Sequence, residues 1–205
     1  MKLFKIFAIA ALALVGSVRV QAGVVFSNMG GNGLTDTAAN QNVDLVPTER
    51  YASGFTTGPT LQQLNWISIV SENNDPGSKT VSIFSDNADS PGVLIGTSNA
   101  TTVSGGRAVN QFNFSGTQLL ANTKYWVLPE TGLAWYQHVD DSAPTALNDS
   151  GFTYAGVRRF KDGGPWNTRS IFFTIAIDSI FVPEPALTSL LCLSGIALIR
   201  RRMKK

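Results

Sequence analysis

Apolar and polar residues alternate along much of the chain between residues 24 and 181. The clearest case is 170–178, where Ile171, Phe173 and Ile175 are separated by residues that would face the other way. Because successive side chains of a strand point to opposite faces, this alternation predicts a strand with one buried face. Shorter segments rich in β-branched and aromatic residues predict further strands at 24–27, 51–55, 61–70, 80–85, 93–97, 109–114, 124–128, 133–138 and 152–157.

Turn-forming residues separate these segments. Asn-Asn-Asp-Pro-Gly at 73–77 and Asp-Asn-Ala-Asp-Ser-Pro-Gly at 86–92 are typical of turns, and residues 28–42 and 140–149 read as polar loops. We expect the strand at 152–157 to pair with that at 133–138. No segment between residues 23 and 185 shows a sustained helical period, so the pattern predicts an all-β protein, an antiparallel β-sandwich of jelly-roll-like type.

The first 22 residues have the three parts of a signal peptide. Lys2 and Lys5 precede an apolar segment at 6–15, and Val-Gln-Ala at 20–22 ends in small residues. We therefore expect an N-terminal signal helix, with signal peptidase cutting between Ala22 and Gly23. The alternative is an uncleaved anchor, which the shortness of the apolar segment disfavours.

The last 24 residues, 182–205, also have three parts. Pro183, Glu184 and Pro185 form an extended hinge, because proline fixes φ and lacks a backbone donor. An apolar segment follows at 186–199, and a basic tip follows that, with Arg200, Arg201 and Arg202 at its start. At ~1.5 Å per residue the apolar segment reaches ~21 Å as a helix, less than the ~30 Å of a bilayer core. The basic tip should stay on the cytoplasmic side.

This order of parts resembles the PEP-CTERM sorting signal of Gram-negative bacteria, which exosortases recognise. The resemblance implies that Pro183, Glu184 and Pro185 are the recognition tripeptide. It also implies that the apolar segment is a transmembrane helix that anchors the chain transiently in the inner membrane. Cutting near the tripeptide would then release the ectodomain to the cell surface or the extracellular matrix of a biofilm. The alternative is an ordinary single-span anchor with a proline-rich stalk.

A second resemblance covers the middle of the chain. It rests on Tyr-Ala-Ser-Gly-Phe-Thr-Thr-Gly at 51–58, Trp-Ile-Ser-Ile at 66–69, Val-Ser-Ile-Phe-Ser-Asp at 81–86, Ser-Pro-Gly at 90–92 and Leu-Ala-Asn-Thr-Lys-Tyr-Trp-Val at 120–127. These segments resemble choice-of-anchor ectodomains, those of type R in particular. That resemblance implies a secreted β-sandwich at 23–181 without an established catalytic activity.

The charge of the central part narrows the range of partners. Eight of the 16 Lys and Arg lie in the two terminal segments, whereas all 14 Asp and Glu lie between residues 23 and 185, which leaves a net charge near −6 there. Such a domain is a poor match for nucleic acid or an anionic membrane, and it is compatible with a cation or a neutral polysaccharide. The only cysteine, Cys192, lies in the apolar tail, so the ectodomain must be held together by its core.

Two groups of residues are candidates for ligand binding. Asp86, Asn87 and Asp89 form an oxygen-rich turn that could contribute to a calcium site, although a hairpin turn with Asx caps explains the same residues. No other cofactor is expected. Trp166, Trp135 and Tyr136 are candidates for stacking on sugar rings, with Trp166 in a loop and one of the adjacent pair buried. Trp66 and Trp126 lie within strong strands, which favours the core for both.

Catalysis has little support in the sequence. His138 lies near Asp140 and Asp141, but no serine has the glycine pattern of a nucleophile elbow, and a single histidine without cysteines does not make a zinc site. We therefore expect a non-enzymatic, structural or adhesive protein of the exopolysaccharide matrix. A carbohydrate-binding module is the alternative, and a secreted hydrolase is the third possibility.

Overall fold

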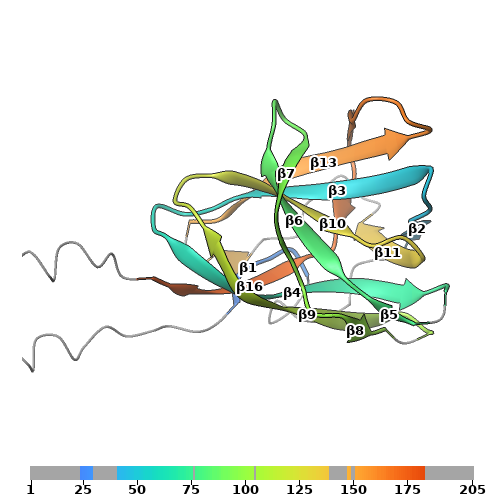
Figure 1. The fold of residues 1–205 in the computed structure, drawn as a ribbon, viewed down its shortest axis with the longest axis horizontal. Coiled ribbons are helices and arrows are strands. Elements are labelled where there is room, and N and C mark those ends of the chain that lie inside the picture. The colour runs from blue at the N-terminus through green and yellow to red at the C-terminus, as the bar shows by residue number, and fades with distance from the viewer. Residues whose placement is uncertain are drawn as a thin grey trace, which may run out of the picture. The chain divides into compact units, whose positions relative to one another are not determined.

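The computed structural model describes residues 24–29, 41–75, 77–103, 105–138, 147–148 and 151–182. In this part of the chain all of the regular structure is β-strand, and the strand pairs given below are antiparallel (Figure 1). The prediction of an all-β, antiparallel, sandwich-like fold is thus confirmed. Residues Ala22–Ile180 group into one compact unit. The two expected terminal helices lie outside the described residues, and within those residues no helix has the length and apolarity of a membrane span.

The larger sheet has eight strands. Its main order is β12-β1-β16-β4-β11-β15, with β9 paired to β4 and β2 paired to β11. These strands are β1 (Val24–Ser27), β2 (Gln41–Asp44), β4 (Gln62–Asn73), β9 (Ala108–Leu119), β11 (Leu133–His138), β12 (Leu147–Asn148), β15 (Phe172–Phe173) and β16 (Ala176–Phe181).

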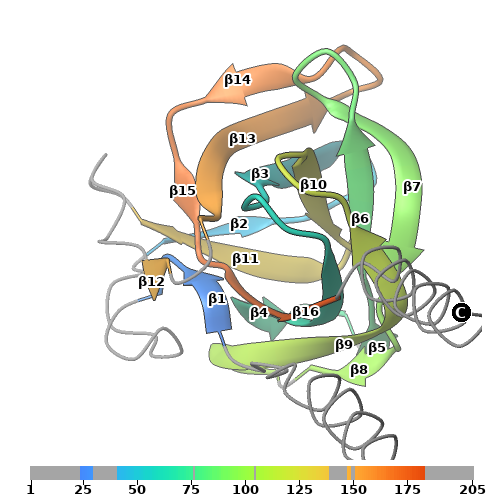
Figure 2. The ribbon, with the colours of Figure 1, turned by 90° about the vertical axis from the view of Figure 1, so that its left-hand side faces the viewer.

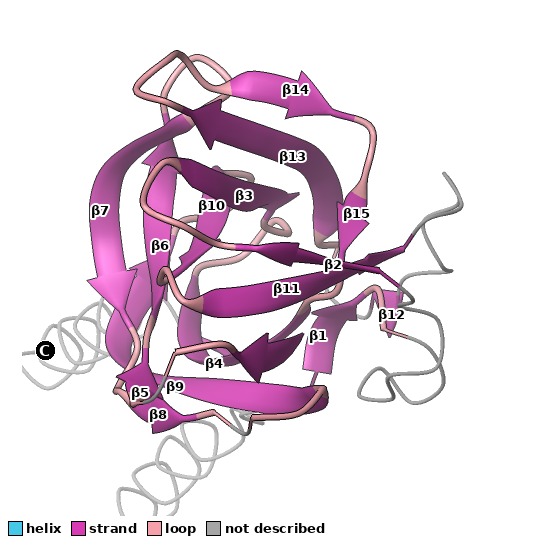
Figure 3. Ribbon diagram, turned by 90° about the vertical axis from the view of Figure 1, so that its right-hand side faces the viewer, coloured by secondary structure: helices cyan, strands magenta, loops and turns pink. Residues whose placement is uncertain are grey.

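The smaller sheet has six strands in the order β14-β13-β3-β10-β6-β7 (Figure 2). They are β3 (Glu49–Thr56), β6 (Val81–Asp86), β7 (Pro91–Thr97), β10 (Lys124–Pro129), β13 (Thr153–Lys161) and β14 (Asn167–Arg169). A two-stranded ribbon joins β5 (Ser78–Lys79) to β8 (Thr101–Thr102). Figure 3 shows the same arrangement from the opposite side.

Aromatic side chains from both sheets fill the core between them. Phe173 of the larger sheet stacks on Trp135, with ring centroids 4.2 Å apart, and meets Tyr51 of the smaller sheet edge-on at 5.4 Å. Phe55 stacks on Phe152 at 5.9 Å. Burying such a side chain fully contributes roughly 1.5–3 kcal/mol, so these rings hold the two sheets together in a domain that contains no cysteine.

The strongest predicted strand is broken in the structure. Residues 170–178 were expected to form one strand, but β15 ends at Phe173 and β16 begins at Ala176. At the break, side chains take the place of the strand ladder. Thr174 Oγ1 accepts from the Val70 N–H (3.0 Å), and Asn28 Oδ1 accepts from the Ile175 N–H (2.7 Å). The chain thereby leaves β11 and continues beside β1 and β4.

One predicted pairing is wrong, and several strands were missed. β13 pairs with β3 and β14 and not with β11. β2 lies at the end of the expected 28–42 loop, and β12 lies within the expected 140–149 loop. β5, β8 and β14 have two or three residues each, too few for an apolar pattern to reveal.

Candidate functional site

The turn at 86–92, predicted as a hairpin turn and a candidate for calcium, joins β6 to β7. The Asn87 N–H donates to the Ser90 carbonyl (2.8 Å), and the Asp89 N–H donates to Asp86 Oδ2 (3.3 Å). Ala88 and Asp89 both have positive φ, 47° and 66°. Left-handed backbone at two consecutive non-glycine residues is costly, so contacts outside the turn must stabilise it.

Those contacts come from two cations and an indole. Lys124 and Arg158 both form ion pairs with Asp89, and Lys124 Nζ lies 3.9 Å from Asp86 Oδ1. The Trp126 Nε1–H donates to Asp86 Oδ1 (2.8 Å). Cations of the protein itself therefore neutralise the two carboxylates. Within the described ranges, no group of three or more Asp, Glu, His or Cys is placed to hold a metal ion.

Trp126 lies on the outer surface of the six-stranded sheet and yet is 0% exposed. Its neighbours Tyr125 and Val127 point into the core, so Trp126 points outward. Lys124 Nζ lies 4.5 Å and the Arg158 guanidinium carbon 5.6 Å from the ring centroid. On β3, a Cβ at Gly54 would lie only 2.9 Å from Trp126 Cζ3. The indole is thus buried as predicted, but beneath a charged cover and not between the sheets.

The three stacking candidates lie in different places. Trp135 is 0% exposed in the core, where its Nε1–H donates to the Thr174 carbonyl (3.0 Å), so it is the buried member of the adjacent pair. Tyr136 is half-buried on the outer surface of the larger sheet, and its hydroxyl donates to Glu72 (2.9 Å). The Arg107 guanidinium lies 4.8 Å from the Tyr136 ring centroid. Trp166 lies in the turn before β14, as predicted, and is partly exposed.

Trp166 belongs to a larger feature that the sequence did not reveal. Its ring lies 5.7 Å from that of Phe160 on β13, and Phe160 pairs with Arg50 on β3. Arg50 in turn lines a groove of about 200 Å³. The other lining residues of the groove are Thr80, Ser82, Phe84, Leu128, Pro129, Glu130 and Thr131.

We call Phe84, Leu128, Arg50, Phe160 and Trp166 the sheet-face strip. All five are partly or fully exposed, and together they span β6, β10, β3, β13 and the turn before β14. Adjacent strands are ~4.8 Å apart, so β6 and β13, three steps apart, are separated by ~14 Å. Arg50 is exposed and makes no ion pair with another described residue. Outward-facing positions on several predicted strands could have indicated the strip only if their pairing order were known.

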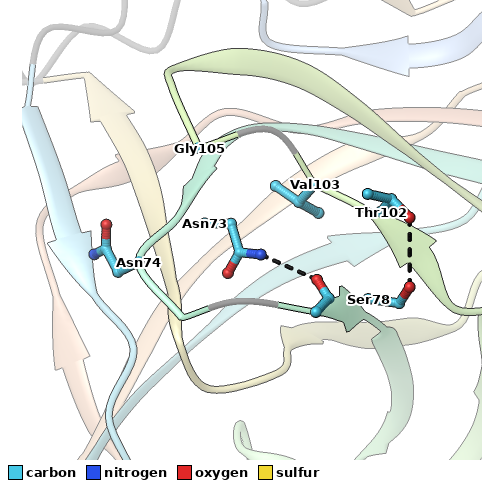
Figure 4. A pocket seen from close by; sticks show the side chains of 7 residues that line it. Asn73, Asn74, Ser78, Thr102, Val103 and Gly105 are labelled. Atoms are coloured by element: carbon cyan, nitrogen blue, oxygen red, sulfur yellow. Dashed lines mark hydrogen bonds between the residues drawn. The ribbon is translucent and has the colours of Figure 1, made fainter.

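A second hollow lies beside the β5–β8 ribbon (Figure 4). It measures about 410 Å³ and is lined by Asn73, Asn74, Gly77, Ser78, Thr102, Val103 and Gly105. Its polar side chains bond to the protein: the Asn73 amide donates to the Gly77 carbonyl (3.0 Å), the Asn74 amide to Asp44 (2.8 Å), and Ser78 contacts Thr102 at 3.5 Å. With no aromatic or charged group among its described lining residues, it is a weaker candidate than the strip.

A charged group at the start of β3, next to Arg50, is structural. The Tyr51 hydroxyl donates to Glu49 Oε1 (2.6 Å), and Arg159 forms an ion pair with the same oxygen at 2.6 Å. The hydrogen bond from Tyr51, aided by Arg159, lowers the pKa of Glu49, while burial raises the pKa of Tyr51 to about 12. Neither group changes its charge near neutral pH, so this cluster has no proton to transfer there.

The comparisons with known proteins add no relative: no protein-family model matches the chain, and no curated protein matches it. The sorting tripeptide Pro183–Pro185, the basic tip Arg200–Arg202 and the expected cleavage pair of Ala22 and Gly23 lie outside the described residues. Their roles stay predictions from the sequence.

Proposed function

We propose that this chain is an exported, non-enzymatic protein of the cell surface or exopolysaccharide matrix, sorted and processed by an exosortase. The observation that carries the proposal is the fixed order at the C-terminus: Pro183-Glu184-Pro185, then an apolar segment of 14 residues, then an arginine-rich tip. The signal-peptide pattern at 1–22 and the acidic, cysteine-free central part add support.

Delivery is the mechanism that these features support. Signal peptidase removes residues 1–22 during export. The short apolar segment holds the chain in the inner membrane, and the basic tip prevents its translocation. Cutting near Pro183-Glu184-Pro185 then frees the ectodomain for the surface or the matrix, where it has a structural or adhesive role.

We also propose that the ectodomain is a jelly roll of the choice-of-anchor type. The strand orders support this, because β1-β16-β4-β9 and β3-β10-β6-β7 each combine early and late strands of the chain. A jelly roll consists of two such four-stranded sheets. The remaining long strands, β11 and β13, are then additions to the common arrangement.

Intact mass measurement of the chain from the medium and from membranes tests the processing. We expect a secreted species that begins near Gly23 and ends near Pro185. Replacing Pro183, Glu184 and Pro185 together by alanine should leave the chain in the membrane fraction with Lys205 intact. The matched control Thr188→Ala, within the apolar segment, should be processed normally. Secreted material that retains Lys205 would contradict the proposal.

A second candidate function, carbohydrate binding, rests on the sheet-face strip. The strip combines aromatic rings at both ends with Arg50 beside the groove, and aromatic rings with nearby polar groups suit stacking on sugars. The hydroxyls of Thr80 and Ser82 at the groove bond to Glu130 and Thr97. A glycan array tests this candidate. We expect Trp166→Ala and Phe84→Ala each to weaken binding at least tenfold, and Leu120→Ala, an exposed residue outside the strip, to have no effect. The absence of binding to any glycan would remove this candidate.

A further inference from the structure

Two cations and an indole lie together on the outer surface of the six-stranded sheet. The Trp126 ring rests on β3 at Gly54, where a Cβ would lie 2.9 Å from the ring. Lys124 Nζ and the Arg158 guanidinium carbon lie over the same ring, 4.5 Å and 5.6 Å from its centroid. We call Trp126, Lys124 and Arg158 the cation–indole site. Since Trp126 pairs with Phe84 across β10 and β6, the site continues the sheet-face strip.

A carboxylate of the chain itself occupies this site. Asp89, in the turn that joins β6 to β7, forms ion pairs with both Lys124 and Arg158. The Arg158 Nε–H also donates to the Asp89 carbonyl. Arginine and lysine are the side chains with which proteins recognise carboxylates. The position of Asp89 therefore shows which chemical group the site takes.

The turn that supplies Asp89 is poorly suited to hold it there. Ala88 and Asp89 both have left-handed backbone, which is unfavourable for residues other than glycine. The Asp89 side chain is 55% exposed, and ion pairs open to solvent contribute little to stability. A carboxylate from outside can therefore displace Asp89. Asp86 accepts from the Trp126 Nε1–H (2.8 Å) from the end of β6, so the indole keeps its place when the turn moves.

The distribution of charge favours an anion on this sheet, although the domain as a whole is acidic. Six of the eight Lys and Arg between residues 23 and 181 lie on its strands, whereas only two of the 14 Asp and Glu, Glu49 and Asp86, do so. Screening limits the reach of exposed charges to ~8 Å at physiological ionic strength, and packed sheets lie ~10 Å apart. The acidic residues of the larger sheet therefore oppose an anion at this site only weakly.

We propose that the cation–indole site binds an acidic sugar of a polysaccharide, and that Asp89 occupies the site until this ligand arrives. A uronic acid has both groups that the site requires: a carboxylate for Lys124 and Arg158, and an apolar ring face for the indole of Trp126. Binding exchanges one carboxylate for another, so the two cations stay neutralised while the turn moves away. The acidic ligand is a specific case of the carbohydrate binding proposed above, on which this inference rests.

Calorimetric titration of the full chain with oligogalacturonate, in one mild detergent, tests the proposal. Its methyl ester is the matched probe, because esterification keeps the sugar chain and removes the charge, and it should bind at least tenfold more weakly. Asp89→Asn removes the competing carboxylate and should tighten binding of the acid at least tenfold. Arg158→Met should weaken binding at least tenfold. The control Arg107→Met removes the same charge just before β9 of the larger sheet and should bind like the native chain.

Hydrogen exchange gives a second measurement that needs no variant. Amides at 87–90 should exchange faster when saturating oligogalacturonate is bound, because the turn leaves the site. An unchanged rate in the bound chain would refute the displacement of Asp89. The proposal is also overturned if acid and ester bind equally, if Asp89→Asn binds the acid no better than the native chain, or if neither chain binds it.

These outcomes separate the acidic ligand from carbohydrate binding in general. If neutral glycans bind, and Trp166→Ala weakens that binding while Asp89→Asn and Arg158→Met do not change it, the strip binds carbohydrate without the cation–indole site. In that case the acidic ligand is wrong and the second candidate function stands. Binding to no glycan, acidic or neutral, would remove both.

Discussion

The two edge strands of the six-stranded sheet, β14 and β7, expose different kinds of side chain to solvent. β14 exposes Asn167, Thr168 and Arg169, whereas β7 exposes three aliphatics at 93–95. Figures 2 and 3 show where the two edge strands lie. Six of the eight Lys and Arg between residues 23 and 181 lie on β3, β10, β13 and β14. Charge thus gathers on the β14 side and is absent from β7. Charged residues on an edge discourage pairing with another chain, so the difference separates a protected edge from an open one.

The two sides are nevertheless connected across the outer surface of the sheet. Arg158, on β13 beside β14, forms an ion pair with Asp89, in the turn that leads into β7. Trp126 lies beneath this contact. The arrangement suggests that the position of the open edge depends on charges that come from the protected side, and variants can test each part of that connection.

The largest effect is expected from Trp126→Ala. The indole is fully buried and contacts both sides of the connection, and removing such a side chain costs about 3–5 kcal/mol. Urea unfolding should show this loss, and the β6–β7 turn should exchange its amides faster. Trp166→Ala, at a partly exposed ring near β14, is the matched comparison and should cost below about 1 kcal/mol. Equal losses for the two variants would mean that Trp126 has no special role.

Gly96→Ala perturbs only the β7 side. A Cβ at residue 96 would lie 2.5 Å from Thr117 Oγ1 on β9, so either the Thr117 side chain or the two strands must shift, at a cost of about 1–3 kcal/mol. Gly105→Ala has open space around its Cβ and should be nearly neutral. The double variant Gly96→Ala/Thr117→Ala should recover part of the loss. Without such recovery in thermal unfolding, the close approach would not be the cause.

In the free energy of unfolding, we expect a moderate coupling between Arg158 and Asp89. Arg158 is 10% and Asp89 55% exposed in their side chains, and because solvent screens the aspartate we expect a coupling of about 1 kcal/mol. Arg158→Met, Asp89→Asn and the double variant form the cycle that measures it. The coupling should shrink in 1 M salt. Strictly additive effects would show that the two sides of the sheet are independent.

The smallest expected effects are changes of stability with pH, and they come from Glu49 and Tyr51 at the start of β3. The pKa of Glu49 is lowered in the folded chain, chiefly by the Tyr51 hydrogen bond, so its contribution is present above pH 4.5 and is lost as the pH falls below that value. The pKa of Tyr51 is raised from 10 to about 12, so its contribution is lost as the pH rises through that interval.

Unfolding measured across pH separates these two contributions. Glu49→Gln should flatten the acid limb. Tyr51→Phe should remove the alkaline contribution and, because it also removes the hydrogen bond that lowers the pKa of Glu49, should weaken the acid limb as well. Leu120→Ala, which touches neither group, should leave both limbs unchanged. If Glu49→Gln keeps the full acid sensitivity, other carboxylates account for it.

Local patterns in the sequence determined which segments are strands. The strands at 24–27 and 133–138 have the predicted bounds, and each of the other predicted strands except 170–178 overlaps one observed strand, because alternation and turn chemistry are properties of neighbouring residues. The proposals for the two terminal segments also rest on the sequence alone, since a signal is recognised by the order of its parts along the chain.

Tertiary structure decided everything that depends on distant partners. β13 lies against β3, about a hundred residues earlier in the chain, because hydrogen-bonding order in a sheet is a property of the whole fold. The break after Phe173 needs Asn28, from a segment expected to be a loop. Trp126 is buried by Arg158 and by the turn at 86–89, and the bulges of β7 form only against β6. No residue's neighbours in sequence carry that information, because the free energy of each arrangement comes from contacts made only after the sheets have assembled.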